Sequence, residues 1–364
     1  MTEFCRHLTN GLDYNNVAGE FTMSPCCYFA KQDVIDSQKT NIAELRQSWQ
    51  NSDLEKNCAI CLHTESSGRG SYRTASFEMM KGQSNKLQHL NVQINKQCNL
   101  ACASCSSIHS SFWFQENQRN NIEQPLHIKN IHTKPKYEAI KDEFLSWLEK
   151  EDLSELKYIK FSGGEPLMSD LHLKVLALVD NPQQVSLQYT SNFSIMPTDT
   201  TFKVWEQFKL VKWIASIDGV GERFTFLRWP YDWKTLDPFA KQAKEKAPNN
   251  VMFGVEHTLN PLNIYYFDEF EQWYNQNLST NRLGDKSDLN LHLCWGNLDI
   301  KYTPVELRQK IVEKYSSDHT ICSLVKDIPE PVEIQGLLDY LDNLDQWRNQ
   351  NWREIFHDVQ HHFA

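Results

Sequence analysis

Strand-forming and helix-forming segments alternate along most of this chain, and this alternation limits the folds that the chain can adopt. Six segments are rich in β-branched and aromatic residues: LNVQI (90–94), LKYIKF (156–161), VSLQYT (185–190), VKWIASI (211–217), VMFGVEHTL (251–259) and LNLHLCW (289–295). Segments with apolar residues at helical spacing lie between them: YEAIKDEFLSWLEK (137–150), LHLKVLALV (171–179) and YFDEFEQWYNQN (266–277). Strands that alternate with helices usually form a parallel sheet. We therefore predict an α/β fold whose sheet is open or curled into part of a barrel.

The sequence predicts three regions. Residues 1–85 have few periodic runs but hold five of the ten cysteines, so we expect a small N-terminal Cys-rich domain that needs a metal to hold its shape. Residues 86–300 contain the alternating segments. Residues 301–364 form a C-terminal helical extension in this interpretation.

Four segments carry local predictions. The polar stretch 64–77 is interpreted as a connector, and the Pro-containing stretch 115–136 as a loop insertion. Residues 303–317 and 331–360 are expected to be helical throughout. The second of these carries an apolar stripe that we interpret as packing: Leu337, Leu338, Leu341, Leu344 and Trp347.

Charge and hydropathy narrow the class of protein. The net charge of −10 argues against a general nucleic-acid binder, since such proteins carry a basic footprint. No apolar run approaches the roughly 20 residues that span a bilayer, and the N-terminus lacks the pattern of a signal peptide. We therefore expect a cytoplasmic protein with no membrane contact. Its ten cysteines are then metal ligands or catalytic groups rather than disulfides.

Three cysteines follow the first predicted strand of the alternating region. The segment CNLACASC places Cys98, Cys102 and Cys105 on a loop at the carboxyl end of that strand, where α/β barrels build active sites. Thiolates suit iron–sulfur clusters or zinc. A cluster held by three cysteines leaves one iron open for a ligand. A zinc ion would need a fourth ligand from elsewhere in the chain, and the spacing alone leaves both interpretations open.

Further motifs follow the next strands in order, and together with the cysteines they resemble the radical S-adenosylmethionine superfamily. FSGGEPLM (161–168) is similar to the family's GGEP motif, YTSN (189–192) follows the third strand, and SIDG (216–219) with Arg228 resembles the family's SxDG stretch. The resemblance implies a partial (β/α)6 TIM-type barrel with a [4Fe–4S] cluster on the three cysteines and bound S-adenosylmethionine. Ser104 departs from the pattern, because many members have an aromatic residue there. The cofactor contacts that the resemblance implies are Gly163, Gly164, Glu165, Pro166, Ser191, Asn192, Ser216, Asp218 and Arg228.

The N-terminal cysteines resemble a narrower group, in which a twitch (SPASM-like) domain precedes the barrel. That resemblance implies a second, auxiliary iron–sulfur cluster of the [4Fe–4S] kind near the barrel mouth. Its ligands would be Cys5, Cys26, Cys58 and Cys61. Cys27 is the alternative to Cys26, since adjacent strand residues point to opposite faces. A [2Fe–2S] centre and a structural zinc ribbon are the other options.

The resemblance implies an oxidoreductase that abstracts hydrogen from a substrate, for which we favour a peptide. Oxidative cross-linking or dehydrogenation would use the auxiliary cluster as electron acceptor, and an external donor such as flavodoxin or ferredoxin would reduce the first cluster. The competing hypotheses are a peptide epimerase with Cys294 or Cys322 as hydrogen donor, a small-molecule dehydrogenase, and a zinc-stabilised binding module. His257 or its neighbour Glu256 is a candidate proton acceptor, because only one of the two can point inward.

Overall fold

The computed structural model describes residues 5–17, 20–34, 40–66, 68, 70–80, 86–93, 96–279, 289–315, 319–326, 328 and 332–363. Within them the strands form one sheet of nine strands in the order β3-β2-β1-β4-β5-β6-β7-β8-β9. Their bounds are β1 Gly11–Val17, β2 Glu20–Ser24, β3 Asp33–Val34, β4 His89–Gln93, β5 Tyr158–Phe161, β6 Ser186–Ser191, β7 Leu210–Ser216, β8 Val251–Leu259 and β9 Leu289–Leu293. Strands β4 to β9 run parallel to one another, as the alternation of segments predicts.

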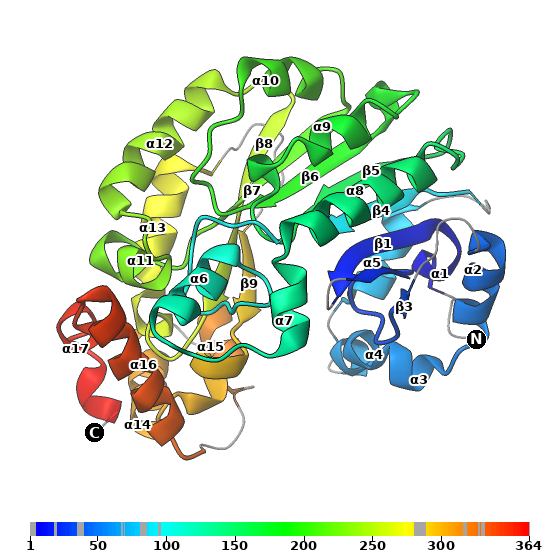
Figure 1. Ribbon diagram of the computed structural model, residues 1–364. Helices are drawn as coiled ribbons and strands as arrows, with labels where there is room; N and C mark the ends of the chain where they lie inside the picture. The colour runs from blue at the N-terminus through cyan, green and yellow to red at the C-terminus, as the bar shows by residue number, and fades with distance from the viewer. Residues whose placement is uncertain are drawn as a thin grey trace.

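Helices follow the strands of the parallel part and cover the outer side of the curled sheet (Figure 1). The longer connections carry α8 Lys134–Leu148, α9 Leu171–Leu176, α10 Asp199–Trp205, α11 Gly221–Leu227, α12 Trp233–Lys246 and α13 Phe267–Asn277. This strand–helix order and the cysteine-rich start confirm the α/β fold class of a partial (β/α)6 TIM-type barrel.

The two faces of the sheet differ sharply in chemistry. One row of neighbouring residues is mostly aromatic and packs on the helices: Tyr14, Val92, Phe161, Tyr189, Trp213 and Phe253. Tyr14 lies 4.2 Å from Phe144 of α8 between ring centroids, and Tyr189 lies 4.8 Å from Trp205 of α10. Side chains alternate between faces along a strand. The preceding residue of each strand therefore points to the concave side.

That concave row is polar along five strands. Its members pair in register as Asp13, Asn91, Lys160, Gln188 and Lys212. The interior of the barrel is thus lined with charged and amide groups at this level, while the helix-covered side supplies the hydrophobic core.

The N-terminal segment joins the sheet instead of standing apart from it. Strand β1 pairs with β4 in parallel, with Leu12 opposite Leu90, and β2 runs antiparallel to β1. The helices of this segment are α1 His7–Asn10, α2 Ile42–Gln50, α3 Leu54–Asn57, α4 Ala59–Ser66 and α5 Tyr72–Met79. The boundary expected near residue 85 lies outside the described residues, and the connector expected at 64–77 is largely helical.

The prediction of a loop insertion at 115–136 was wrong. The expected loop at 115–136 contains the end of α6 Ser111–Arg119, all of α7 Leu126–Ile131 and the start of α8. The segment is polar overall, but Ile128 and Ile131 bury their side chains. Few apolar anchors are enough to hold short helices against a large protein surface.

The C-terminal region is helical but interrupted. It contains α14 Val305–Lys314, α15 Thr320–Lys326, α16 Gln335–Arg348 and α17 Trp352–Ile355. The continuous helix expected over 331–360 ends at Asn349, which has a left-handed backbone with φ 51°. In the described part of the chain, no helix is long and apolar enough to cross a membrane.

Candidate functional site

The loop with Cys98, Cys102 and Cys105 follows β4 and lies at the carboxyl end of the parallel strands. The Ser111 hydroxyl, at the start of α6, accepts a hydrogen bond from the Cys98 backbone N–H at 3.1 Å and donates one to the Cys98 carbonyl at 3.1 Å. The Cys105 N–H donates to the Cys102 carbonyl at 2.9 Å. The backbone of the loop is therefore folded into a fixed turn.

Residues far away in the sequence hold the middle of this loop. The indole of Trp113 donates to the Cys102 carbonyl at 2.8 Å, and the Tyr340 hydroxyl donates to the Ala103 carbonyl at 2.7 Å. Arg348 donates to the Ala101 carbonyl at 2.8 Å and forms a buried ion pair with Glu116 at 2.8 Å. Sequence reasoning missed these residues, because no local pattern links a C-terminal helix to the cysteine loop.

Two of the three sulfur atoms receive side-chain N–H groups. Asn192 Nδ2 lies 3.6 Å from Cys98 Sγ, and Arg228 Nη1 lies 3.6 Å from Cys102 Sγ. Burial raises the pKa of Cys98 and of Cys105 to about 12, and it raises the pKa of Cys102 as well. Free thiolates are unfavourable here, so these sulfurs need a metal to hold them deprotonated.

The donors on this loop are compatible with an iron–sulfur cluster by their chemistry. Three thiols lie on one partly buried loop, and side-chain N–H groups reach two of the sulfurs. N–H···S bonds of this kind are common around iron–sulfur clusters. Among the described residues, no group of three or more His, Cys, Asp or Glu side chains is already arranged around one ion position.

The GGEP turn packs directly on the residue before Cys98. A Cβ on Gly164 would lie 2.2 Å from the Gln97 carbonyl oxygen, so only glycine permits this approach. Gly163 has φ 119°, which also favours glycine. Pro166 is buried and begins the short helical turn Pro166–Met168 that closes the motif.

Glu165 turns its side chain into the protein. Its carboxylate accepts hydrogen bonds from Leu167 N–H at 3.1 Å, Ser191 Oγ at 3.0 Å and Asn192 N–H at 2.7 Å. Burial raises the pKa of Glu165 to about 7. Glu165 and Ser191 thus connect the loops after β5 and β6. Because the Glu165 carboxylate is used inside the protein, a ligand at the GGEP turn would contact the backbone of the turn instead.

The SIDG segment and Arg228 complete the set at the end of β7. Ser216 is the last residue of that strand and is half-buried. Asp218 is buried, and its Oδ2 lies 2.7 Å from Arg228 Nε. The cysteine loop, the GGEP turn, YTSN and SIDG therefore lie at the carboxyl ends of four successive parallel strands, two of them in contact with cysteine sulfurs. The chain resembles the radical S-adenosylmethionine superfamily.

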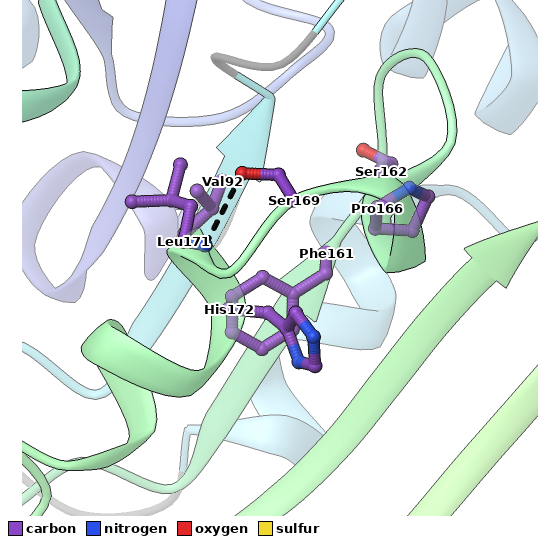
Figure 2. Close-up of a pocket in the computed structure, with 7 residues that line it drawn as sticks. All are labelled: Val92, Phe161, Ser162, Pro166, Ser169, Leu171 and His172. Carbon is purple, nitrogen blue, oxygen red and sulfur yellow. Dashed lines mark hydrogen bonds between the residues drawn. The ribbon is translucent and has the colours of Figure 1, made fainter. Parts of the chain in front are cut away.

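Two pockets near these motifs differ in size. A cavity of about 10 Å³ lies beside the GGEP turn. Figure 2 shows its lining residues, among them Phe161, Ser162, Pro166 and His172. It holds one water at most. In the same view the Leu171 N–H donates to Ser169 Oγ at 3.2 Å.

A larger hollow of about 350 Å³ adjoins the start of the cysteine loop. Its lining runs from the loop to the end of the GGEP motif: Lys96, Gln97, Ser111, Gln115, Ile131, His132, Tyr137 and Met168. Helices α6 and α7, which the sequence did not predict, form much of its wall.

The N-terminal cysteines gather at the other end of the strands. Cys5 precedes α1 and β1, and Cys26 follows β2, whose Ser24 pairs with Asp13 near the start of β1. Burial, and after it the negative charge of Cys5 and of Cys61, raises the pKa of Cys58 to about 11. Cys5 and Cys26 therefore lie towards the amino ends of the parallel strands, and the charges of Cys5 and Cys61 reach Cys58.

Cys26 and Cys27 have different neighbours. The pKa of Cys26 is raised by burial, then by the charge of Cys27 and of Cys5. The pKa of Cys27 is raised to about 12, by burial and by Asp13, while Lys160 opposes the shift. Asp13 acts on both cysteines, while Cys5 acts on Cys26 and Cys61 acts on Cys27, so both lie near other N-terminal cysteines.

The three candidate catalytic residues lie in different places. Cys294 follows β9, and burial together with the charge of Asp218 raises its pKa to about 12. Cys322 is buried in α15, where its sulfur faces the Tyr315 carbonyl at 3.7 Å. His257 packs on Phe270 of α13 at 4.2 Å between ring centroids, so it faces the helices, whereas Glu256 faces Thr190 across the interior at 3.4 Å. The charges of Asp218 and Arg228 act on both Cys294 and His257, whereas Cys322 lies apart from them in α15.

Of the known proteins compared with this chain, only solved structures match it. No protein-family model matches the chain, and no curated protein matches it. Histidine-tagged anSMEcpe with bound AdoMet matches with TM-score 0.41 at 13% identity, over 62% of this chain and 58% of that one. The chain thus spans less than two thirds of that protein.

Structures of Streptococcus suis SuiB also match. SuiB bound to S-adenosylmethionine gives TM-score 0.37 at 11% identity, over 93% of this chain and 70% of that one. SuiB bound to its precursor peptide SuiA gives TM-score 0.38 at 12% identity, over the same 93% and 70%. Matches with TM-scores this low do not support a role for any single residue of the site.

Proposed function

We propose that this chain is a radical S-adenosylmethionine enzyme that removes a hydrogen atom from a peptide substrate. The observation that carries the proposal is the meeting of three motif loops at one partly buried cysteine triplet. Asn192, from the loop after β6, lies 3.6 Å from Cys98 Sγ, and Arg228, after α11, lies 3.6 Å from Cys102 Sγ. A zinc-stabilised binding module would not need this convergence.

Cys98, Cys102 and Cys105 would hold a [4Fe–4S] cluster, and the GGEP backbone and the ends of β6 and β7 would hold S-adenosylmethionine. When bound, these groups supply one electron that breaks the sulfonium C–S bond, which yields methionine and a 5′-deoxyadenosyl radical that takes hydrogen from a substrate C–H bond. The protein's own residues would hold the cysteine loop in place, exclude water, and orient S-adenosylmethionine and the substrate. An external low-potential donor of the flavodoxin or ferredoxin type would provide the electron.

The concave row of the barrel supports a polar substrate that reaches into the interior. Asp13, Asn91, Lys160, Gln188 and Lys212 line it with donors and acceptors in register. A peptide presents donors and acceptors at every residue, and it could exchange hydrogen bonds with such a lining. We therefore favour a peptide over a small apolar molecule.

Cys5, Cys26, Cys58 and Cys61 would hold the auxiliary cluster, which we place at the opposite end of the strands from the first. A substrate in the interior would then lie between two redox centres. After loss of its hydrogen atom, the substrate radical would pass one electron to the auxiliary cluster and one proton to a base. This balance gives a net oxidation such as a cross-link or a dehydrogenation.

Anaerobic purification tests the cluster assignment. We expect a brown protein that absorbs near 400 nm and holds about eight irons, four for each [4Fe–4S] cluster. Reduction in the presence of S-adenosylmethionine should release 5′-deoxyadenosine, and Cys98→Ala should abolish that release. Ser106→Ala is a matched control beside the same loop, because the contacts described for Ser106 there use its carbonyl, which the substitution keeps. A colourless protein with one or two zinc ions would overturn the proposal.

The auxiliary site is tested by Cys58→Ala with Cys61→Ala. We expect the release of 5′-deoxyadenosine to continue while oxidised product is lost. Unchanged product would exclude the auxiliary cluster as electron acceptor.

Epimerisation is the second candidate, and the position of Cys294 near Asp218 favours it over dehydrogenation of a small molecule. The Cys294 thiol would give a hydrogen atom to the substrate radical, and the external donor would return one electron, with a proton from solvent, to the sulfur. This reaction predicts one deuterium in product formed in D2O, lost in Cys294→Ala. Product without deuterium would exclude it.

The free thiols also bear on location. All ten cysteines lie in the described part of the chain, and none forms a disulfide. We place the protein in the cytoplasm, where thiols and exposed clusters stay reduced.

A further inference from the structure

The backbone on both sides of Arg228 is hydrogen-bonded to the cysteine loop. The Ala103 N–H donates to the Leu227 carbonyl at 2.8 Å, and the Ala101 N–H donates to the Trp229 carbonyl at 2.7 Å. The residues on both sides of Arg228 are thus hydrogen-bonded to residues on both sides of Cys102. This pairing places Arg228 Nη1 3.6 Å from Cys102 Sγ.

The guanidinium of Arg228 is held from its other side by Asp218. The Asp218 Oδ2 lies 2.7 Å from Arg228 Nε, and its Oδ1 accepts the Thr258 backbone N–H at 2.7 Å. The side chain of Asp218 is 1% exposed and that of Arg228 is 10% exposed. Both charges therefore act in a medium that screens them much less than water does.

We propose that Arg228 and Asp218 together set the reduction potential of the cluster held by Cys102, with opposite signs. This inference rests on the proposed function. Adding an electron makes a cluster more negative, so the positive charge and N–H···S bond of Arg228 stabilise the reduced form. The carboxylate of Asp218 opposes part of that charge and fixes the direction in which Arg228 donates. Arg228 is thus a positioning residue that acts through the cysteine sulfur.

The test is a potentiometric titration of the full-length, cluster-loaded protein, followed by electron paramagnetic resonance without S-adenosylmethionine. Arg228→Gln should lower the potential, by about tenfold in the one-electron equilibrium constant, which corresponds to about 59 mV. Arg228→Lys keeps the positive charge but loses the forked geometry of the guanidinium. The potential of this variant should therefore lie between those of wild type and Arg228→Gln. Asp218→Asn should raise the potential, because it removes the opposing charge without changing the shape of the side chain.

Arg223→Gln is the matched control. Arg223 lies in α11, the helix that ends just before Arg228, but it pairs with Glu269 of α13 and stacks on Tyr266. Its replacement should leave the potential unchanged, although it can lower the melting temperature. A loss of stability alone would therefore not produce the expected changes in reduction potential.

Several outcomes overturn the inference. Potentials that stay unchanged in Arg228→Gln, or that move in the same direction in Arg228→Gln and Asp218→Asn, contradict it. A change only in the affinity for S-adenosylmethionine would make Arg228 a cofactor contact and nothing more. A wild-type protein without any iron–sulfur signal would instead refute the proposed function itself, which keeps the two failures apart.

Discussion

The carboxylate of Glu165 accepts the backbone N–H of Asn192 at 2.7 Å, and this bond joins the turn after β5 to the loop after β6. Asn192 in turn donates to Asn99 Oδ1 at 2.8 Å and reaches Cys98 Sγ. Glu165 therefore positions the cysteine loop through Asn192, although its own side chain points away from the sulfur atoms.

Replacement of Glu165 should weaken this connection. In Glu165→Ala the Asn192 and Leu167 N–H groups lose their acceptor in a buried site, at a cost of about 1–3 kcal/mol for each unsatisfied group. We expect a lower melting temperature and faster loss of iron in the presence of a chelator. Iron retention at the wild-type rate would show that Glu165 does not support the loop.

Gly164→Ala should be more harmful than its size suggests. The added Cβ would meet the Gln97 carbonyl oxygen at 2.2 Å, and backbone on both sides leaves little room to relax. We expect destabilisation by about 2 kcal/mol or more and weaker binding of S-adenosylmethionine, measured by calorimetry.

Gly336→Ala serves as the comparison for that variant. Nothing lies within 4 Å of a Cβ at Gly336, which is in helix α16. This change should stabilise the protein by about 0.5–1 kcal/mol. Equal effects of the two substitutions would contradict the close approach at the GGEP turn.

Arg348 and Glu116 should behave as a buried pair. Their atoms are 2.8 Å apart, and the two side chains are 0% and 7% exposed. Glu116→Gln leaves the Arg348 charge without its partner and should cost about 3–5 kcal/mol in unfolding free energy. Because Arg348 also holds the Ala101 carbonyl, iron content should fall as well.

The double variant Arg348→Met with Glu116→Leu separates charge from packing. Removing both charges should recover part of the stability lost in Glu116→Gln. The Ala101 carbonyl would still lack its donor, so we expect iron retention to stay below wild type. Full recovery of both properties would argue that Arg348 has no part in shaping the loop.

Asp13 should make stability depend on pH. Burial raises the pKa of this carboxyl to about 7, from an ordinary value of 3.8. The unfolded chain therefore loses this proton at lower pH than the folded chain does. The stabilisation is complete below about pH 4 and is lost as pH rises towards 7.

We expect wild type to lose on the order of 2 kcal/mol relative to Asp13→Asn between pH 5 and pH 7.5. Thermal melting at the two pH values, under anaerobic conditions, measures the difference. Parallel changes in both proteins would show that Asp13 is already ionised in the folded state at pH 5.

The two adjacent cysteines after β2 should differ in iron binding. The family pattern favours Cys26 as the ligand, and the charge of Cys5 acts on Cys26 while that of Lys160 acts on Cys27. Cys26→Ser should reduce the iron content from about eight to about four, the content of one cluster, and Cys27→Ser should leave it unchanged. The reverse result would make Cys27 the ligand.

Much of the architecture was predictable from local sequence. All six predicted strands of the parallel sheet are present, because β-branched and aromatic residues form buried strands wherever helices cover a sheet. The order of the cysteine loop, GGEP, YTSN and SIDG at the ends of four successive strands could also be read directly from the sequence.

Polar segments were harder to interpret. Helices α6 and α7 carry few apolar residues, so their pattern resembled a loop, yet Trp113, Ile128 and Ile131 bury enough surface to anchor them. Likewise, the break at Asn349 depends on a single left-handed residue in an otherwise helical pattern.

The sequence by itself determined the strand–helix alternation, the cysteine triplet and the adjacency of Cys26 and Cys27, because each depends on neighbouring residues alone. Only the tertiary structure decided that His257 faces the helices and that Arg348 and Tyr340 hold the loop around Cys102. These relationships join residues separated by as many as 247 positions. They depend on which face of a strand a side chain takes and on how the terminal helix packs, and neither is encoded in a local pattern.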